Sequence, residues 1–262
     1  MGGKCSQMGK IGFLFPGQGA QYVGMGKDFY ESFPESKAIY DTAADILDVD
    51  IADICFNGPE EKLRQTVYAQ GAIFTTSMAV LAAIKKRYPD ITPAVNLGLS
   101  LGEYPALVSA EVIGFEDALR LVRQRGVFME EAAQNNPGGM LSIIGLPEDT
   151  CRDIARESDV DVANYNSPAQ IVLSGTKGNI SLAHDIAQAR GAKKAVVLNV
   201  SGAFHSRLME PAAINLKNVL EHVELHVPAS GFIPNIKAEF ETDPLAIRNA
   251  LISQVAHSVK WT

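Results

Sequence analysis

The sequence contains few of the residues that form disulfide frameworks and metal centres. It has three cysteines, an odd number without a CxxC pair, and five histidines without an HExxH pattern. We therefore expect neither a disulfide scaffold nor a metal site, and this use of cysteine is typical of a reducing cytoplasm. The chain also lacks an apolar run approaching the ~20 residues that cross a bilayer, so no membrane segment is expected.

An excess of positive charge is missing too. The formal net charge is −7, whereas a nucleic-acid partner requires a basic surface, so we expect none. Apolar residues make up 47% and charged residues 20% of the 262, which is typical of a soluble globular protein with one large domain, or one large and one small. Without a repeat or heptad pattern to indicate self-association, we expect a monomer.

The first half of the chain alternates predicted strands and helices. The hydrophobic pattern predicts a buried strand at 11–15, helices at 22–33 and 71–88, a second buried strand at 94–100, and helices at 104–112 and 115–133. Such alternation indicates a parallel sheet covered by helices on both faces, an α/β fold.

The order of predicted strands and helices changes after Gln134. Strands at 140–144, 160–165, 170–173 and 194–198 and helices at 147–157 and 180–190 follow one another as βαββαβ, the split pattern of ferredoxin-like folds. We predict a small inserted domain over residues 134–199 and a larger, discontinuous domain over residues 8–133 and 200–262.

A serine stands between two glycines where the second strand meets a helix. Gly98-Leu99-Ser100-Leu101-Gly102 matches GxSxG, the turn that projects a nucleophilic serine from a strand end. The turn needs glycines two residues before and after the serine, because a Cβ there would collide. The pattern also occurs as an ordinary glycine-rich turn, and the flanking strand and helix favour the nucleophile.

A serine hydroxyl needs a base, and His205 is the candidate. It follows the last strand of the predicted insert among small neighbours, in "GAFHS". A lone histidine is more often a satisfied core residue, and no aspartate or glutamate stands out as a third member. The sequence therefore indicates a Ser–His pair and does not identify a triad.

Arg125 lies on the apolar stripe of the predicted helix 115–133. Residues 3, 4 and 7 positions away are apolar, whereas Arg120 and Arg123 point to other faces. A buried guanidinium is costly unless it is paired. Either an internal acid meets it, or a carboxylate arrives with the substrate.

Gln18 follows the first predicted strand in "FPGQG". The carboxyl ends of parallel strands meet at the ligand crevice, so we expect Gln18 near Ser100. Gly17-Gln18-Gly19 also suggests a dinucleotide motif, but the third glycine of that motif is replaced by Tyr22.

Together these segments resemble the malonyl-CoA:acyl carrier protein transacylase family. The resemblance runs from about residue 10 to residue 262. It rests on six motifs in order: "FPGQGAQ" at Phe15, "GLSLGEY" at Gly98, "RQRGVFM" at Arg123, "NYNSPAQIVLSG" at Asn164, "GAFHS" at Gly202 and "QVAHSVKWT" at Gln254.

The resemblance implies an α/β-hydrolase-like domain with a ferredoxin-like insert. It implies transfer of malonyl from malonyl-CoA to the phosphopantetheine thiol of an acyl carrier protein, a step of fatty acid biosynthesis that needs no cofactor. Ser100 is then the nucleophile, His205 its base and Arg125 the partner of the malonyl carboxylate.

The resemblance also assigns backbone groups. The N–H groups of Gln18 and Leu101 would form the oxyanion hole, and the backbone carbonyl of Gln254 would orient the histidine. An acidic third member is then unnecessary.

Two departures keep alternatives open. Leu99 stands where the family usually has histidine, and the family usually continues past the final "KWT", so we expect a chain truncated at its C-terminus. The alternatives are a serine esterase or thioesterase and an inactive module that binds carrier protein. Carrier proteins are acidic, and Arg190, Lys193 and Lys194 are the candidates for a local basic patch.

Overall fold

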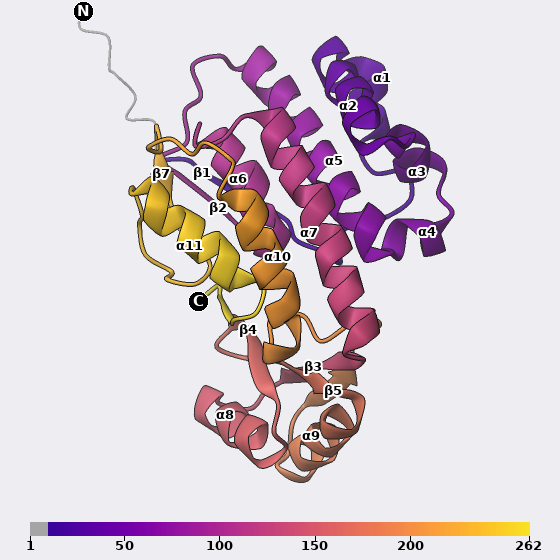
Figure 1. Cartoon of the computed structure of the whole chain (residues 1–262), viewed down its shortest axis with the longest axis vertical. Coiled ribbons are helices and arrows are strands. Elements are labelled where there is room, and N and C mark those ends of the chain that lie inside the picture. Colours follow the sequence, from indigo (N-terminus) through magenta and orange to yellow (C-terminus); the bar gives the residue numbers. More distant parts are fainter. Residues whose placement is uncertain (1–9) are drawn as a thin grey trace, which may run out of the picture.

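The computed structural model describes residues 10–262. Cys5 and residues 8 and 9, the expected start of the larger domain, lie outside the described residues. The described chain forms two units arranged along the longest axis of the molecule, a larger helical one around a parallel sheet and a smaller one built on an antiparallel sheet (Figure 1).

A short parallel sheet lies in the larger unit. Its order is β1-β2-β7, with bounds β1 Gly12–Phe15, β2 Val95–Gly98 and β7 Gly231–Phe232. The predicted strand at 11–15 is confirmed, but its predicted burial is wrong. In this edge strand Leu14 is 62% exposed, and Phe15 is the residue that is buried in the core.

Helices surround this sheet. The larger unit contains α1 Lys27–Ser32, α2 Pro34–Leu47, α3 Ile51–Asn57, α4 Glu60–Arg64, α5 Thr66–Arg87, α6 Glu103–Ser109, α7 Phe115–Asn135, α10 Glu210–Leu220 and α11 Pro244–Gln254. The helix expected from residue 22 begins only at Lys27. Gly24 and Gly26 adopt positive φ angles of 101° and 75°, which an α-helix excludes.

Helix α5 is the one helix within residues 10–262 that is long and apolar enough to cross a membrane. It packs against α2 and α7, and most of its apolar window is buried inside the protein. Its apolar character therefore serves the core. The core continues along α7, which runs beside α5 and leads into the smaller unit (Figure 1).

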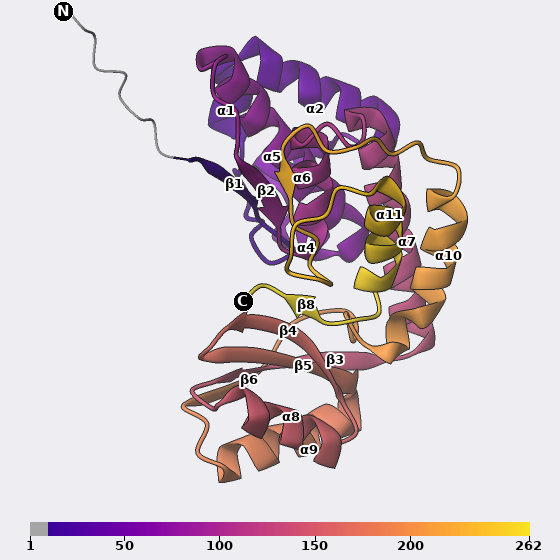
Figure 2. The same cartoon turned by 90° about the vertical axis from the view of Figure 1, so that its left-hand side faces the viewer.

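The smaller unit has the predicted βαββαβ order. Its elements are β3 Gly138–Ile144, α8 Glu148–Glu157, β4 Asp161–Ser167, β5 Gln170–Thr176, α9 Lys177–Ala189 and β6 Lys194–Val197. The strands are antiparallel in the order β6-β3-β5-β4, and α8 and α9 cover one face of the sheet (Figure 2). The other face is turned toward the larger unit.

The chain end links the two units. β8 Val259–Lys260 pairs with β4 in parallel and extends the small sheet to five strands. These two residues fall in the range that the sequence assigns to the larger domain. The division into a larger domain of residues 8–133 and 200–262 and an insert at 134–199 stays a prediction. Strand β8 lies between the larger and the smaller unit (Figure 2).

Candidate active site

The turn after β2 holds Ser100 in a left-handed backbone conformation, with φ of 52°. A Cβ on Gly98 would collide with the backbone of Gly102, and a Cβ on Gly102 would collide with the carbonyl of Phe15. The steric requirement for glycine at both positions is therefore confirmed. Strain of this kind costs roughly 1–3 kcal/mol and persists where the surroundings enforce it.

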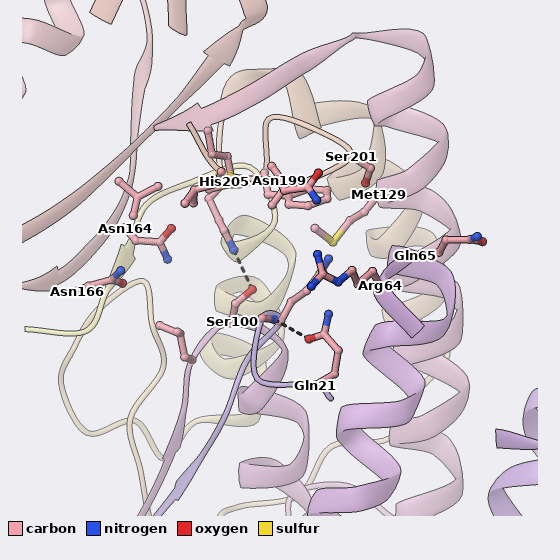
Figure 3. A pocket seen from close by; sticks show the side chains of 18 of the residues that line it. Gln21, Arg64, Gln65, Ser100, Met129, Asn164, Asn166, Asn199, Ser201 and His205 are labelled. Carbon is pink, nitrogen blue, oxygen red and sulfur yellow. Dashed lines mark hydrogen bonds between the residues drawn. The ribbon is translucent and has the colours of Figure 1, made fainter. Parts of the chain in front are cut away.

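The serine hydroxyl and the His205 imidazole are in hydrogen-bond contact. Ser100 Oγ lies 2.8 Å from His205 Nε2 (Figure 3), and His205 Nδ1 lies 2.7 Å from the backbone carbonyl oxygen of Gln254. Because a carbonyl oxygen only accepts, Nδ1 carries the proton and donates it. Nε2 is then the unprotonated nitrogen that accepts from the serine O–H.

The surroundings keep this imidazole neutral. Burial and, to a smaller extent, the positive charge of Arg125 together lower the pKa of His205 to about 4, although the Gln254 carbonyl favours the charged form. At neutral pH the unprotonated Nε2 of His205 therefore directs its lone pair at the Ser100 hydroxyl, the state that a general base requires.

Arg125 lies beneath the serine and is only 1% exposed. Its Nη1 donates to Gln70 Oε1 at 2.7 Å, and its Nη2 donates to Ser100 Oγ at 2.9 Å and to Gln254 Oε1 at 3.0 Å. Burial lowers the pKa of Arg125, and nearby Glu103 opposes that shift. No carboxylate of the described residues forms an ion pair with the guanidinium within 4.0 Å, so the positive charge is not consumed by an internal salt bridge.

The guanidinium has spare donors. It carries five N–H groups, and the contacts with Gln70, Ser100 and Gln254 use three of them. The buried Nε–H has no partner in the described part of the chain, and one Nη1–H also remains. An unpaired buried donor is unfavourable until an acceptor arrives.

The two expected oxyanion donors, Gln18 and Leu101, follow β1 and the nucleophile respectively. Gln18 lines the same cleft as Ser100, as adjacent parallel strands predict. Within residues 10–262, neither backbone N–H donates a hydrogen bond to another protein group. Both N–H groups thus lack a protein acceptor in the described part of the chain, and their role in an oxyanion hole stays a prediction.

A cleft of about 630 Å³ opens above the serine–histidine pair. One wall comes from the larger unit, with Gln18, Leu99 and Met129, and the other from the small sheet, with Asn164 and Val172. Leu99, which replaces the family's usual histidine, thus faces the cleft. Figure 3 shows the Ser100 and His205 side chains meeting at its floor, between these walls.

Three polar residues of the site were not predicted from the sequence. Asn235 Oδ1 accepts from the Ser100 N–H at 2.6 Å, Glu103 accepts from the Asn235 N–H at 2.6 Å, and Gln70 binds Arg125. Glu103 lies within the quoted motif "GLSLGEY", and its place in the first turn of an otherwise apolar helix was the available signal.

The expected basic patch is only partly free. Arg190 pairs with Glu157 at 2.5 Å, whereas Lys193 and Lys194 are exposed where β6 begins. For a metal, the described residues contain no group of three or more His, Cys, Asp or Glu side chains that could hold one. The binding of a carrier protein to the basic patch of Arg190, Lys193 and Lys194 stays a prediction.

Comparison with known proteins is decisive for the family. The acyl transferase domain model matches residues 12–248. The chain belongs to this family. A malonyl CoA-acyl carrier protein transacylase of Bacillus subtilis is 42% identical over 97% of this chain and 81% of its own length. The resemblance inferred from the six sequence motifs is thereby confirmed.

Solved acyl transferase structures agree with the fold. An acyl-carrier-protein S-malonyltransferase from Burkholderia pseudomallei is 39% identical and superimposes with a TM-score of 0.92, covering 96% of this chain and 83% of that one. A malonyl-transacylase solved in complex with a type II PKS acyl-carrier protein is 38% identical with a TM-score of 0.91, covering 97% and 83%. The predicted α/β fold class is confirmed.

Proposed function

We propose that this acyltransferase moves a malonyl group from malonyl-CoA to the phosphopantetheine thiol of an acyl carrier protein in fatty acid biosynthesis. The observation that carries the proposal is the position of one hydroxyl. Ser100 Oγ lies 2.8 Å from a neutral imidazole and 2.9 Å from a buried guanidinium. A nucleophile, its base and a receptor for an anionic acyl group thus meet at one point.

In the first half-reaction Ser100 Oγ attacks the thioester carbonyl of malonyl-CoA while His205 Nε2 takes the hydroxyl proton. The carbonyl oxygen becomes an oxyanion, which the Gln18 and Leu101 N–H groups stabilise; removing one such donor typically costs ~3 kcal/mol. The C–S bond then breaks, and His205 returns the proton to the coenzyme A thiolate. The product is a malonyl ester on Ser100.

The malonyl carboxylate goes to Arg125. It would accept from the free Nε–H and replace the contact that Nη2 now makes with Ser100 Oγ, giving the bidentate geometry that guanidinium favours for carboxylates. The Gln254 carbonyl keeps His205 in the tautomer that each proton transfer needs.

The second half-reaction reverses the first with a different thiol. His205 takes the proton of the phosphopantetheine thiol, the sulfur attacks the ester, and the proton passes to Ser100 Oγ as the ester bond breaks. The hydroxyl, imidazole and backbone N–H groups supply this chemistry without a metal or redox cofactor. The setting we propose for this reaction is the cytoplasm, where malonyl-CoA and carrier proteins are found together.

The test follows both fates of the acyl group. The chain is mixed with malonyl-CoA, with and without a holo acyl carrier protein, and malonyl-carrier, free malonate and acyl-enzyme are measured together. We expect the carrier protein to be loaded faster than malonate is released, and a Ser100→Ala variant to do neither. Faster release of malonate than loading would indicate a thioesterase, and carrier binding without either reaction would indicate a binding module.

A further inference from the structure

Glu103 is buried directly behind the nucleophile turn, and the acyl transfer described above gives it no role. It is the first residue of α6 and is 1% exposed. Its Oε1 accepts from the Asn235 N–H at 2.6 Å, and its Oε2 accepts from Gln254 Nε2. Burial raises the pKa of Glu103 to about 8, while these two hydrogen bonds and the charge of Arg125 favour the ionised form.

The contact with Glu103 is one of four that set the orientation of the Gln254 side-chain amide. Gln254 Nε2 faces three acceptors: Glu103 Oε2, the backbone carbonyl oxygen of Ser100 at 2.8 Å and Asn235 Oδ1 at 3.5 Å. Gln254 Oε1 faces a donor, Arg125 Nη2, at 3.0 Å. If the amide rotated by half a turn, N–H would face N–H and oxygen would face oxygen, so Glu103 helps to fix which end meets the guanidinium.

Among the described residues Glu103 makes no direct hydrogen bond to Arg125, and the Gln254 amide links the two side chains. The sequence left open whether Arg125 pairs with an internal acid or with a carboxylate of the substrate. In the structure an internal acid, Glu103, lies near Arg125 without pairing with it. Burial lowers the pKa of Arg125, and the nearby Tyr104 and Glu103 oppose that shift, but no ion pair within 4.0 Å joins Glu103 to the guanidinium. The guanidinium is thus oriented by Gln254 without losing its Nε–H, which stays unpaired among the described residues.

The backbone carbonyl of Gln254, which orients His205, depends much less on Glu103. Gln254 is the last residue of α11, so its main chain is held by the helix, and only its side chain is held by Glu103. Loss of the Glu103 contact should therefore disturb Arg125 more than it disturbs His205.

We infer that Glu103 is a positioning residue of this active site: by holding the Gln254 amide it aims the Arg125 guanidinium at the carboxylate of the acyl substrate. The inference rests on the proposed function, since it presupposes a substrate with a free carboxylate. Glu103 touches no reacting atom, and its effect should appear as a loss of discrimination between charged and uncharged acyl groups.

The first experiment compares Glu103→Gln with Glu131→Gln, an exposed glutamate on α7 with no hydrogen-bond partner in residues 10–262. For each variant, kcat/KM for loading from malonyl-CoA and from acetyl-CoA is measured beside the melting temperature. The Gln amide would place an N–H where Glu103 Oε2 now accepts from Gln254 Nε2. We therefore expect Glu103→Gln to lower the malonyl-to-acetyl ratio about tenfold, as the loss of one hydrogen bond would. The control should leave the ratio unchanged.

A double variant separates positioning from general damage. If Glu103 acts through Arg125, adding Glu103→Gln to Arg125→Ala should leave the malonyl-to-acetyl ratio where Arg125→Ala alone puts it. Equal losses for both substrates in the single variant, or a further fall of the ratio in the double variant, would overturn the inference. If Glu103→Gln does not fold, Glu103→Asp, which withdraws the carboxylate by one methylene, should show the same fall in ratio.

The failure of the inference is distinguishable from that of the proposed function. A native chain that forms no malonyl ester contradicts the proposed function and the role of Glu103 with it. A native chain that prefers malonyl, together with a folded Glu103→Gln variant that keeps the preference, contradicts the role of Glu103 alone.

Discussion

Replacement of Arg125 by alanine should abolish the preference for a charged acyl group. The guanidinium is buried and its Nε–H has no partner among the described residues, so we expect a substrate carboxylate to pair with Nε–H and with Nη2, which would leave Ser100. Charged hydrogen bonds contribute about 1.5–3 kcal/mol each. The variant should therefore lose at least about 3 kcal/mol for malonyl-CoA, or about a hundredfold in kcat/KM.

The same substitution also removes contacts that both substrates share. Gln70, Gln254 and the serine hydroxyl each lose a donor, so the melting temperature and acetyl loading should fall as well. The ratio of kcat/KM for malonyl-CoA to that for acetyl-CoA isolates the carboxylate contact. It is measured by quenching the acyl transfer reaction at set times. Arg120→Ala, which removes an exposed arginine paired with Glu116 on the same helix, is the control. Equal losses for the two substrates in Arg125→Ala would refute the reasoning.

Four other outcomes are expected. Since the pKa of His205 is lowered from 6.5 to about 4, malonyl loading should stay level as pH falls from 7 to about 5 and decline only near 4; a decline centred at 6.5 in a pH–rate profile would contradict this. The unfolded chain takes up a proton below pH 6.5 that folded His205 does not, so this residue should lower the free energy of unfolding between pH 6.5 and 4. Gly102→Ala should destabilise the fold by about 3 kcal/mol or more in urea unfolding, because its Cβ would collide with backbone, whereas Gly178→Ala, where a Cβ meets nothing within 4 Å, should not. Asn235→Ala should slow malonyl and acetyl loading alike, at a cost of about 1–3 kcal/mol, because it leaves the backbone N–H of the nucleophile unpaired; a selective effect on malonyl would argue against that role.

Local rules were enough to predict the groups that meet in the cleft. The collision at Gly98 and Gly102 follows from the geometry of a strand that turns sharply into a helix. Arg125 was identified from helical periodicity alone, because an arginine on an apolar stripe must be buried. The contact between Ser100 and His205, 105 residues apart, was expected from chemistry, since a serine nucleophile needs a base.

The residues that support these groups could not be predicted in the same way. Asn235 binds Ser100 and Glu103 across 135 and 132 residues, and neither periodicity nor a local motif marks Asn235 itself. Glu103 was visible in the sequence, but only the packing of α6 against neighbouring elements shows that it is buried and faces Gln254.

Burial of a strand depends on its neighbours in the sheet, which the sequence does not give. Residues 11–15 are apolar enough for a central strand, yet β1 lies at the edge and exposes Leu14. Helices α2, α3 and α4 went unpredicted as well. α3 and α4 have only 7 and 5 residues, too few to show a clear hydrophobic period, so tertiary packing determines them.

The most direct measurement is the mass of the Ser100 peptide after brief exposure of the native chain to malonyl-CoA and acid quench. Because Ser100 Oγ faces both a neutral imidazole and a buried guanidinium, we expect that peptide to carry one malonyl ester, which disappears when holo acyl carrier protein is added before the quench. An unmodified Ser100 peptide, or a malonyl group found on another residue, would contradict the role assigned to this hydroxyl.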